Sequence, residues 1–189
     1  MRVFHVAKPY GYEFLPLTAR LVVTPLTERV FQSLLLAMYY DFGGAPYGPA
    51  GTGKTETVKD LSKRIARNCF VFNCSSGMEL GQMAELLSGV VACGYWSCFD
   101  EFNRIHITVL QVLSELFIKI QQTKQLNKER LGVISEIDIN GALVPFQPEC
   151  GLFITMNPYL TQGRSKLPSN LKNLFRVVTM IVPDTALIA

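Results

Sequence analysis

Apolar residues recur along this chain with two alternating periods, which predict a mixed α/β protein. Four nearly continuous apolar runs have the length of strands, and they cover residues 68–74, 95–99, 151–156 and 177–182. Such runs are typical of strands buried on both faces of a parallel sheet. Between them apolar residues recur at helical spacing, as in the stripe Leu110, Leu113, Phe117 and Ile120. The alternation predicts a mostly parallel, five-stranded sheet with helices on both faces.

The first helix has a clear start signal. Thr24 is a good N-cap and Pro25 suits the first helical position, so a helix is expected from there to about Tyr40. Residues 20–23 are expected to form a short extended piece before it. After the helix, Gly43-Gly44 is expected to end it, and residues 45–47 are expected to lead into a loop.

The remaining segments predict shorter elements. A helix is expected over residues 80–91, an exposed polar connection over 121–130, and a short helix over 167–176. Residues 137–144 alternate around Asn-Gly, which predicts an inserted β-hairpin. We expect residues 1–20 to be an N-terminal linker or edge segment and residues 21–189 to form one α/β domain.

A glycine-rich stretch stands before the second helix. Residues 48–55, Gly-Pro-Ala-Gly-Thr-Gly-Lys-Thr, match the pattern G-x-x-x-x-G-K-[ST] of a phosphate-binding loop. Its glycines let backbone N–H groups point at an anion, and the following helix adds the positive end of its dipole. Lys54 can bind the outer phosphates and Thr55 can ligate Mg²⁺. A plain surface turn is the alternative, but Val58, Leu61 and Ile65 give the next helix an apolar face, which favours nucleotide binding.

Two acidic residues and one amide follow buried strands. Asp100 and Glu101 end the strand at 95–99, and α/β sheets bind ligands at the carboxyl ends of their strands. Asp100 can hold Mg²⁺, and Glu101 can activate a water for attack on a γ-phosphate. Asn157 follows the next buried strand and can bind that water or a γ-phosphate oxygen. The alternatives are an acidic loop start and an ordinary Asn-Pro turn.

Composition narrows the classes of partner. The chain has 189 residues, 49% of them hydrophobic and 17% charged, which is typical of one folded domain with a large core. A net charge of +3 gives no support for nucleic acid or an anionic membrane, and we expect neither as a partner. No apolar run reaches membrane-spanning length.

The five cysteines have no C-x-x-C spacing, which favours reduced thiols in a cytosolic compartment. Cys69 and Cys74 have the same separation along the chain as Cys93 and Cys98. In extended chain this spacing sends the two partners to opposite faces, so a metal site is not expected there.

Together these stretches resemble the first AAA+ module of a dynein heavy chain. The resemblance begins at about Gly11 and continues to the C-terminus, in the family's order. The matching stretches are residues 21–27, 43–46, 48–57 (GPAGTGKTET), 98–105 (CFDEFNRI), 153–158 (FITMNP) and 167–176, with Val182-Pro183-Asp184. The combination of GPAGTGKTE with CFDEFNR is highly specific. Thr-Glu-Thr after Lys54 and Asn73-Cys74-Ser75 look more like axonemal than cytoplasmic dyneins.

The resemblance implies a P-loop NTPase fold, the AAA+ large subdomain, that binds ATP and Mg²⁺. It implies a metal carboxylate at Asp100, a catalytic base at Glu101, a γ-phosphate sensor at Asn157, and an arginine finger at Arg176 that faces a neighbouring module. Thr55 would also ligate the metal. The implied nucleotide-binding residues are Leu21, Val22, Thr24 and Pro25 around the adenine, and Gly48, Pro49, Ala50, Gly51, Thr52, Gly53, Lys54, Thr55 and Glu56 in and after the loop.

The same resemblance implies partners and a location. The partners would be neighbouring AAA+ modules and the linker of the same heavy chain, with the Asn140-Gly141 hairpin contacting the linker. Intermediate and light chains and microtubules would bind through parts outside this chain. The location would be the cytoskeleton of the cytoplasm, in the axoneme of a cilium or flagellum. No helical lid follows the last strand, so we expect this chain to be one subdomain of a much larger motor.

Several positions depart from the family's pattern. The loop after Asn157 is one residue longer than usual and loses a glycine, and Val177 replaces a proline. Tyr47 and Ser76 stand where acidic residues are common. These departures bear on coupling more than on nucleotide binding.

Three functions remain open from the sequence. The first is an ATPase module that drives a microtubule motor. The second is a nucleotide-binding module that does not hydrolyse ATP, which the altered loop after Asn157 would explain. The third is another phosphoryl-transfer enzyme, such as a small-molecule kinase or a GTPase. Glu101 beside Asp100 favours water activation over a kinase, and the Asn-Lys-x-Asp signature of guanine binding is absent.

Overall fold

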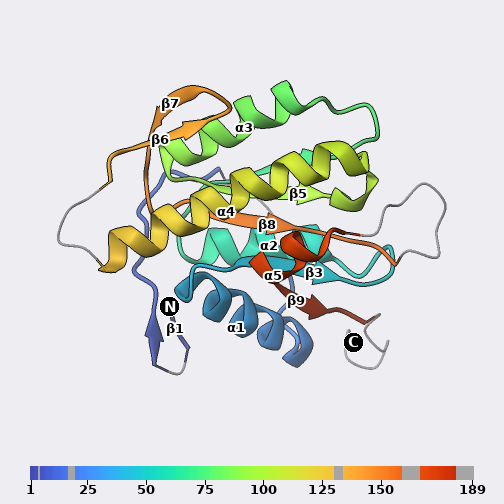
Figure 1. The fold of residues 1–189 in the computed structure, drawn as a ribbon. Coiled ribbons are helices and arrows are strands. Elements are labelled where there is room, and N and C mark those ends of the chain that lie inside the picture. The colour runs from blue at the N-terminus through green and yellow to red at the C-terminus, as the bar shows by residue number, and fades with distance from the viewer. Residues whose placement is uncertain (4, 17–19, 130–133, 159–166, 182–189) are drawn as a thin grey trace.

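A parallel β-sheet forms the centre of the fold in the computed structural model, which describes residues 1–3, 5–16, 20–129, 134–158 and 167–181. The strand order is β4-β5-β8-β3-β9, and every neighbouring pair is parallel, as predicted (Figure 1). The strands are β3 (Gly43–Tyr47), β4 (Cys69–Asn73), β5 (Trp96–Asp100), β8 (Gly151–Ile154) and β9 (Phe175–Thr179).

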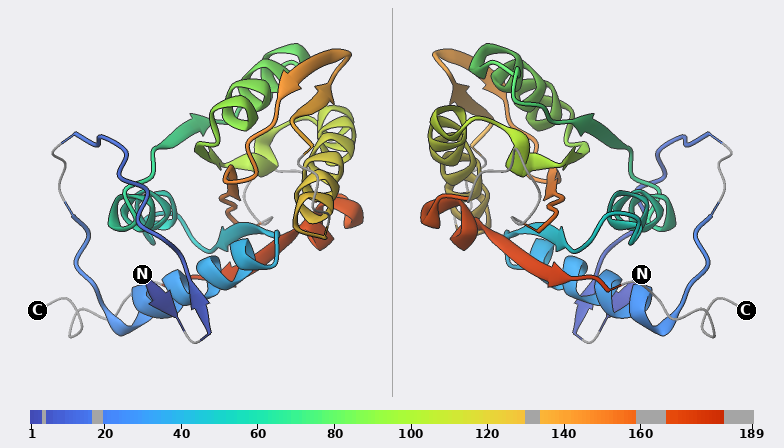
Figure 2. Two further views of the ribbon diagram at one scale, coloured as in Figure 1. Left: turned by 90° about the vertical axis from the view of Figure 1, so that its left-hand side faces the viewer. Right: turned by 90° about the vertical axis from the view of Figure 1, so that its right-hand side faces the viewer.

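Helices cover both faces of this sheet, so the domain has three layers (Figure 2). One face packs against α1 (Pro25–Tyr39) and α2 (Lys54–Arg64). The other packs against α3 (Leu80–Cys93), α4 (Ile107–Glu129) and α5 (Ser169–Leu174). None of the helices in the described part is both long and apolar enough to cross a membrane.

Two antiparallel pairs and a single 3-10 turn complete the described elements. The pairs are β1 (Arg2–Val3) with β2 (Val6–Ala7), which the sequence did not predict, and β6 (Glu136–Ile139) with β7 (Ala142–Pro145). In the second pair Asn140 and Gly141 both have positive φ, so the predicted Asn-Gly hairpin is confirmed. The 3-10 turn η1 (Phe102–Arg104) links β5 to α4.

The predicted start of α1 is confirmed. Thr24 has an extended backbone, and its hydroxyl accepts a hydrogen bond from the N–H of Thr27. Pro25 occupies the first helical position. A backbone N–H at that position has no partner within the helix, so proline loses no hydrogen bond there. The helix ends at Tyr39, one residue before the expected end.

The prediction that residues 43–47 only lead into the loop was wrong, because they form β3, an inner strand of the sheet. Glycine and proline are poor strand formers, so the local sequence hid this strand. The glycines are needed for packing. A Cβ at Gly43 would lie 2.3 Å from the Phe175 ring, and one at Gly44 would lie 2.5 Å from the Leu34 side chain.

The polar stretch 121–130 is not the expected exposed connection, because α4 continues through it to Glu129. Its Gln, Lys and Glu residues are good helix formers despite their polarity. Thr123 is buried, and Lys128 donates a hydrogen bond to the Tyr39 carbonyl oxygen at 2.7 Å. Contacts to other elements therefore extend the helix beyond its apolar stripe.

Residues 20–23 belong to no helix or strand, so the expected short extended piece stays a prediction. Two smaller expectations differ from the structure. Strand β4 lies at the sheet edge, with the Phe70 side chain 47% exposed, and is not buried on both faces. The last strand is Phe175–Thr179 instead of residues 177–182, so the helix before it ends at Leu174.

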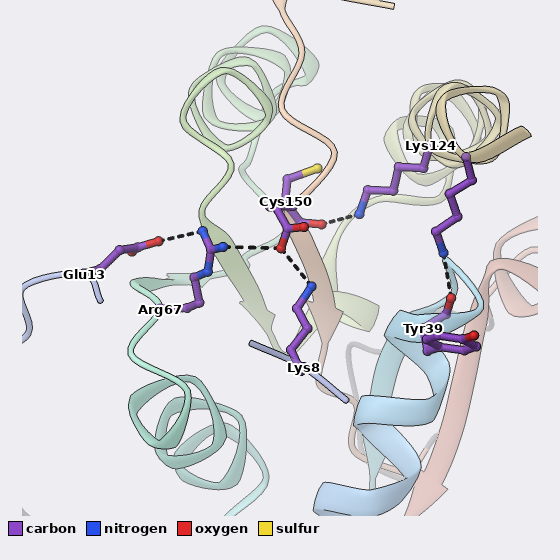
Figure 3. A network of polar contacts seen from close by, with 8 residues as sticks. Lys8, Glu13, Tyr39, Arg67, Lys124 and Cys150 are labelled. Atoms are coloured by element: carbon purple, nitrogen blue, oxygen red, sulfur yellow. Dashed lines mark hydrogen bonds and ion pairs between the residues drawn. The ribbon is translucent and has the colours of Figure 1, made fainter. Parts of the chain in front are cut away.

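Ion pairs connect residues 8–13, near the N-terminus, to the rest of the domain (Figure 3). The Arg67 guanidinium lies 3.0 Å from a Glu13 carboxylate oxygen and 3.3 Å from one of Glu149. Lys8 pairs with the same Glu149 oxygen at 2.8 Å. The N–H of Gly11 also donates to the Ile65 carbonyl oxygen at 2.7 Å. Residues 8–13 therefore lie along the end of α2, next to the strands β4 and β8.

This network predicts a pH-dependent contribution to stability. Burial raises the pKa of Glu149, but the Lys8 hydrogen bond and the charges of Lys8 and Arg67 outweigh it and hold that pKa below its usual value. Stability from a depressed carboxyl pKa is present above the unfolded-state pKa and is lost as pH falls through the folded-state value. We expect Glu149→Gln to lower the urea midpoint at pH 7 and to change it progressively less below pH 4.5, the ordinary glutamate value.

The matched control is Glu85→Gln, which alters an exposed carboxylate on α3 and should leave the midpoint unchanged. A Glu149→Gln deficit that stays constant across this pH range would contradict the proposed ionic origin of the effect.

Candidate functional site

The glycine-rich loop joins the carboxyl end of β3 to the start of α2, which begins at Lys54 as predicted. Strand β3 lies between β8 and β9, while the chain that leaves it through α2 returns at β4, on the far side of β5. Doubly wound sheets bind ligands at such a reversal of strand order. Gly51 and Gly53 have φ of 78° and 76°. Glycine adopts this left-handed conformation readily, whereas a residue with a side chain would be strained in it. The loop thus has the conformational freedom that a backbone anion site needs.

Lys54 is held inside this loop. Its side chain is buried, with the residue only 8% exposed. The ammonium group donates to the carbonyl oxygens of Gly48 at 3.0 Å and Pro49 at 2.6 Å. A buried ammonium group needs hydrogen-bond acceptors. The two carbonyl oxygens therefore hold the positive charge of Lys54 at the N-terminus of α2.

Thr55 and Asp100 meet across the sheet edge. The Thr55 hydroxyl donates to Asp100 Oδ1 at 2.7 Å, and the Thr155 hydroxyl donates to the same oxygen. Magnesium prefers oxygen ligands and is commonly bound by one or two carboxylates together with substrate phosphates. The donors present, a hydroxyl and a carboxylate beside a phosphate loop, therefore fit Mg²⁺.

Glu101 and Asn157 also come together. The Asn157 amide nitrogen donates to Glu101 Oε1 at 3.2 Å, and Arg104 forms an ion pair with Glu101 Oε2. Glu101 has φ 51° and ψ 41°, a left-handed conformation that is costly for a residue with a side chain. Asn157 Oδ1 is buried and has no hydrogen-bond partner among the described residues. Strained backbone and unmatched buried polar atoms are typical of functional sites.

These groups line one polar cavity of about 200 Å³. It is formed by the loop after β3 and by the turns after β5 and β8, three segments that are far apart in the sequence. The lining residues are Ala50, Gly51, Gly53, Lys54, Thr55, Glu56, Asp100, Glu101 and Asn157. Most of the predicted phosphate, metal and catalytic residues are thus in one place, although Gly48, Pro49, Thr52 and Arg176 do not line this cavity.

A second, larger and mainly apolar cavity of about 600 Å³ adjoins the first. Gly51 and Gly53 line both cavities, so the loop separates a polar compartment from an apolar one. Leu21, Val22 and Thr24, which the resemblance implies lie around the adenine, line the larger cavity, whereas Pro25 does not line it. Its volume falls within the range of small-molecule sites.

Sequence reasoning missed several lining residues. The end of β9 and the residues after it, Val178 to Ile181, line the apolar cavity together with Arg29 and Ser33 of α1. The pairing of β9 with β3 brings them there, and nothing in the local sequence indicates that pairing. Thr155 was also missed, although it stands two residues before Asn157, on the same strand end.

Arg176 is not brought to this site. It lies at the start of β9, paired with Gly44, and its side chain is exposed. It lines a different hollow beside Tyr40 and Phe42. An arginine finger acts on another module's nucleotide, so this placement leaves the role a prediction. Residues 159–166, which include the departures after Asn157, lie outside the described residues.

The cysteines show no sign of a metal site. Within the described ranges, no three His, Cys, Asp or Glu side chains lie close enough to hold a metal ion. Burial raises the pKa of the Cys69 and Cys74 thiols to about 12, so both stay protonated at neutral pH.

Comparison with known proteins identifies the family. Residues 10–189 match the family model described as the hydrolytic ATP binding site of the dynein motor region. The chain belongs to this family. The predicted resemblance to the dynein heavy-chain motor is therefore confirmed, and the family description supports nucleotide binding by this chain.

Dynein heavy chains are also found by pairwise comparison. The chain is 48% identical over 179 residues to mouse dynein axonemal heavy chain 3, covering 95% of this chain and 4% of that protein. It is 49% identical over 175 residues to the Chlamydomonas reinhardtii dynein-1-alpha heavy chain of the flagellar inner arm I1 complex, covering 93% and 4%. It is 47% identical over all 189 residues to mouse dynein axonemal heavy chain 12, covering 6% of that protein. The chain thus spans 4% to 6% of the length of these relatives.

Proposed function

We propose that this chain binds MgATP and hydrolyses it as one module of a dynein motor. The observation that carries the proposal is the convergence of Lys54, Thr55, Asp100, Glu101 and Asn157 on one cavity. The alternative of a module that never hydrolyses ATP rested on the loop after Asn157, which lies outside the described residues. The complete set of hydrolytic groups favours turnover.

The geometry supports a division of roles. Lys54 and the loop N–H groups would bind the phosphates, and the apolar cavity would hold the base. Thr55 and Asp100 would hold Mg²⁺, which supplies charge neutralisation for the phosphates when bound. Glu101 would accept a proton from the attacking water while the water oxygen forms a bond to the γ-phosphorus. The bond between the γ-phosphorus and the β-γ bridging oxygen would break at the same time. The products are ADP and phosphate.

The whole motor's properties are part of this proposal. The energy of turnover would move the linker of the heavy chain, which the β6–β7 hairpin would contact. Intermediate and light chains and microtubules would bind outside this chain, and the axonemal relatives support a location in the axoneme of a cilium or flagellum. An arginine from a neighbouring module would stabilise the transition state, a contribution of order 10³ or more in rate. Arg176 would serve the next module in the same way. Because the arginine that completes this site comes from another module, the chain by itself would hydrolyse ATP poorly.

The metal role can be tested apart from catalysis. We expect Asp100→Asn to remove most of the Mg²⁺ dependence of ATP binding, because the substitution removes the charge of the carboxylate that accepts a hydrogen bond from Thr55. The measurement is the Kd of a fluorescent ATP analogue with and without Mg²⁺. Asp138→Asn is the control, because the Asp138 side chain is 46% exposed on the β6–β7 hairpin, and it should keep the wild-type dependence. A normal Mg²⁺ effect in Asp100→Asn would place the metal elsewhere.

A further inference from the structure

We propose that Asn103 and Arg104 are positioning residues that fix Glu101 and Asn157 relative to each other during hydrolysis. Both belong to η1, the single turn between β5 and α4. The inference rests on the proposed function, because it concerns the orientation of the base and the sensor of that same site. Neither residue lines the phosphate cavity, so their effect would reach the substrate only through these two neighbours.

Arg104 acts on the carboxylate of Glu101. One carboxylate oxygen accepts a hydrogen bond from Asn157, and the other forms the ion pair with Arg104. The N–H of Arg104 also donates to the Glu101 carbonyl oxygen at 2.9 Å, so both ends of the ion pair belong to one hydrogen-bonded turn. When Asn157 turns its amide to a γ-phosphate oxygen, Arg104 remains to direct the carboxylate toward the attacking water.

This ion pair is suited to orientation more than to stability. The Arg104 side chain is 50% exposed, and exposed ion pairs contribute little to folding free energy. The left-handed backbone of Glu101 leaves its side chain to be directed by contacts with neighbours. A guanidinium offers directional N–H donors for this purpose.

Asn103 acts on the main chain of Asn157. It is fully buried, and its amide nitrogen donates to the Asn157 carbonyl oxygen at 3.0 Å. Its own Oδ1 has no hydrogen-bond partner among the described residues. An unmatched buried carbonyl lowers stability, so packing alone does not explain an asparagine here. The contact instead ties η1 to the segment that carries the sensor.

Two further hydrogen bonds join the same segments. The N–H of Glu101 donates to the Thr155 hydroxyl at 3.0 Å, and the N–H of Phe102 donates to the Thr155 carbonyl oxygen at 3.0 Å. With the Asn103 contact, three consecutive residues after β5 are bonded to the segment after β8. The base and the sensor therefore sit on one cross-linked unit.

The test uses the motor region that contains this chain, with the variants Arg104→Gln, Arg104→Lys and Asn103→Leu. We expect Arg104→Gln and Asn103→Leu to lower kcat by about tenfold to 10²-fold, as small misplacements of catalytic groups do, with the Kd for ATP unchanged. Arg104→Lys should restore part of the rate, because it keeps the charge without the planar donors. Lys119→Gln breaks an ion pair of similar exposure on α4 and should keep the wild-type kcat.

A double variant separates this inference from the proposed function. In a Glu101→Gln background, Arg104→Gln should lower the residual single-turnover rate no further, because the residues act as a unit. An equal additional loss there would overturn the positioning role. So would a wild-type kcat in Arg104→Gln, provided that Glu101→Gln lowers turnover. A wild-type kcat in Glu101→Gln would instead overturn the proposed function. If Asn103→Leu fails to fold, the Arg104 variants still decide.

Discussion

Glu101→Gln is expected to trap ATP on this module. Glutamine keeps the size of the side chain and can still contact Asn157, but it cannot take the proton of the attacking water. Loss of a general base lowers the rate of hydrolysis by on the order of 10² to 10⁴. Binding should persist, because the phosphate contacts come from Lys54 and the loop. The measurement is phosphate release by the motor region that contains this chain, paired with the Kd for ATP.

The matched control for this substitution is Glu115→Gln, which removes an exposed carboxylate from α4. It should leave both turnover and Kd unchanged. Undiminished phosphate release from the Glu101→Gln module, with the other nucleotide sites of the motor silenced, would mean that another group activates the water.

Lys54→Ala is expected to abolish ATP binding at working concentrations. The substitution removes the buried ammonium group that the loop carbonyls hold at the start of α2. A hydrogen bond to a charged group contributes about 1.5–3 kcal/mol, so each phosphate contact that is lost lowers the affinity by on the order of 10- to 10²-fold. Two loop carbonyls would also lose their donor. The measurement is titration of a fluorescent ATP analogue.

Lys63→Ala provides the control for Lys54→Ala on the same helix. Lys63 lines a different hollow, beside Tyr12 and Ala66, and its loss should change the Kd little. Equal losses of affinity in the two variants would show that general charge, and not the position of Lys54, supports binding.

Much of the site could be predicted because its groups belong to short local patterns. The phosphate loop is contiguous, and Asp100, Glu101 and Asn157 directly follow apolar runs of strand length. Carboxyl ends of parallel strands share one edge of the sheet, so these groups were expected to meet. The cavity that they line is consistent with that argument.

Other parts depend on contacts between distant segments, which no local pattern shows. Strand β3 was missed because Gly43 and Gly44 are poor strand formers, and only the packing of Phe175 and Leu34 makes them necessary. The share of β9 in the apolar cavity follows from its pairing with β3. The end of α4 was misplaced because polar residues hide a helix that tertiary contacts stabilise.

The central claim is that ATP bound in this cavity is hydrolysed there. The most direct measurement is a single turnover of γ-labelled ATP, prebound to the motor region that contains this chain, with the other nucleotide sites silenced by substitution. The account predicts that the bound ATP becomes ADP and free labelled phosphate, and that Glu101→Gln returns it intact. Recovery of intact ATP from the wild-type module would contradict the account and would make the site a nucleotide clamp.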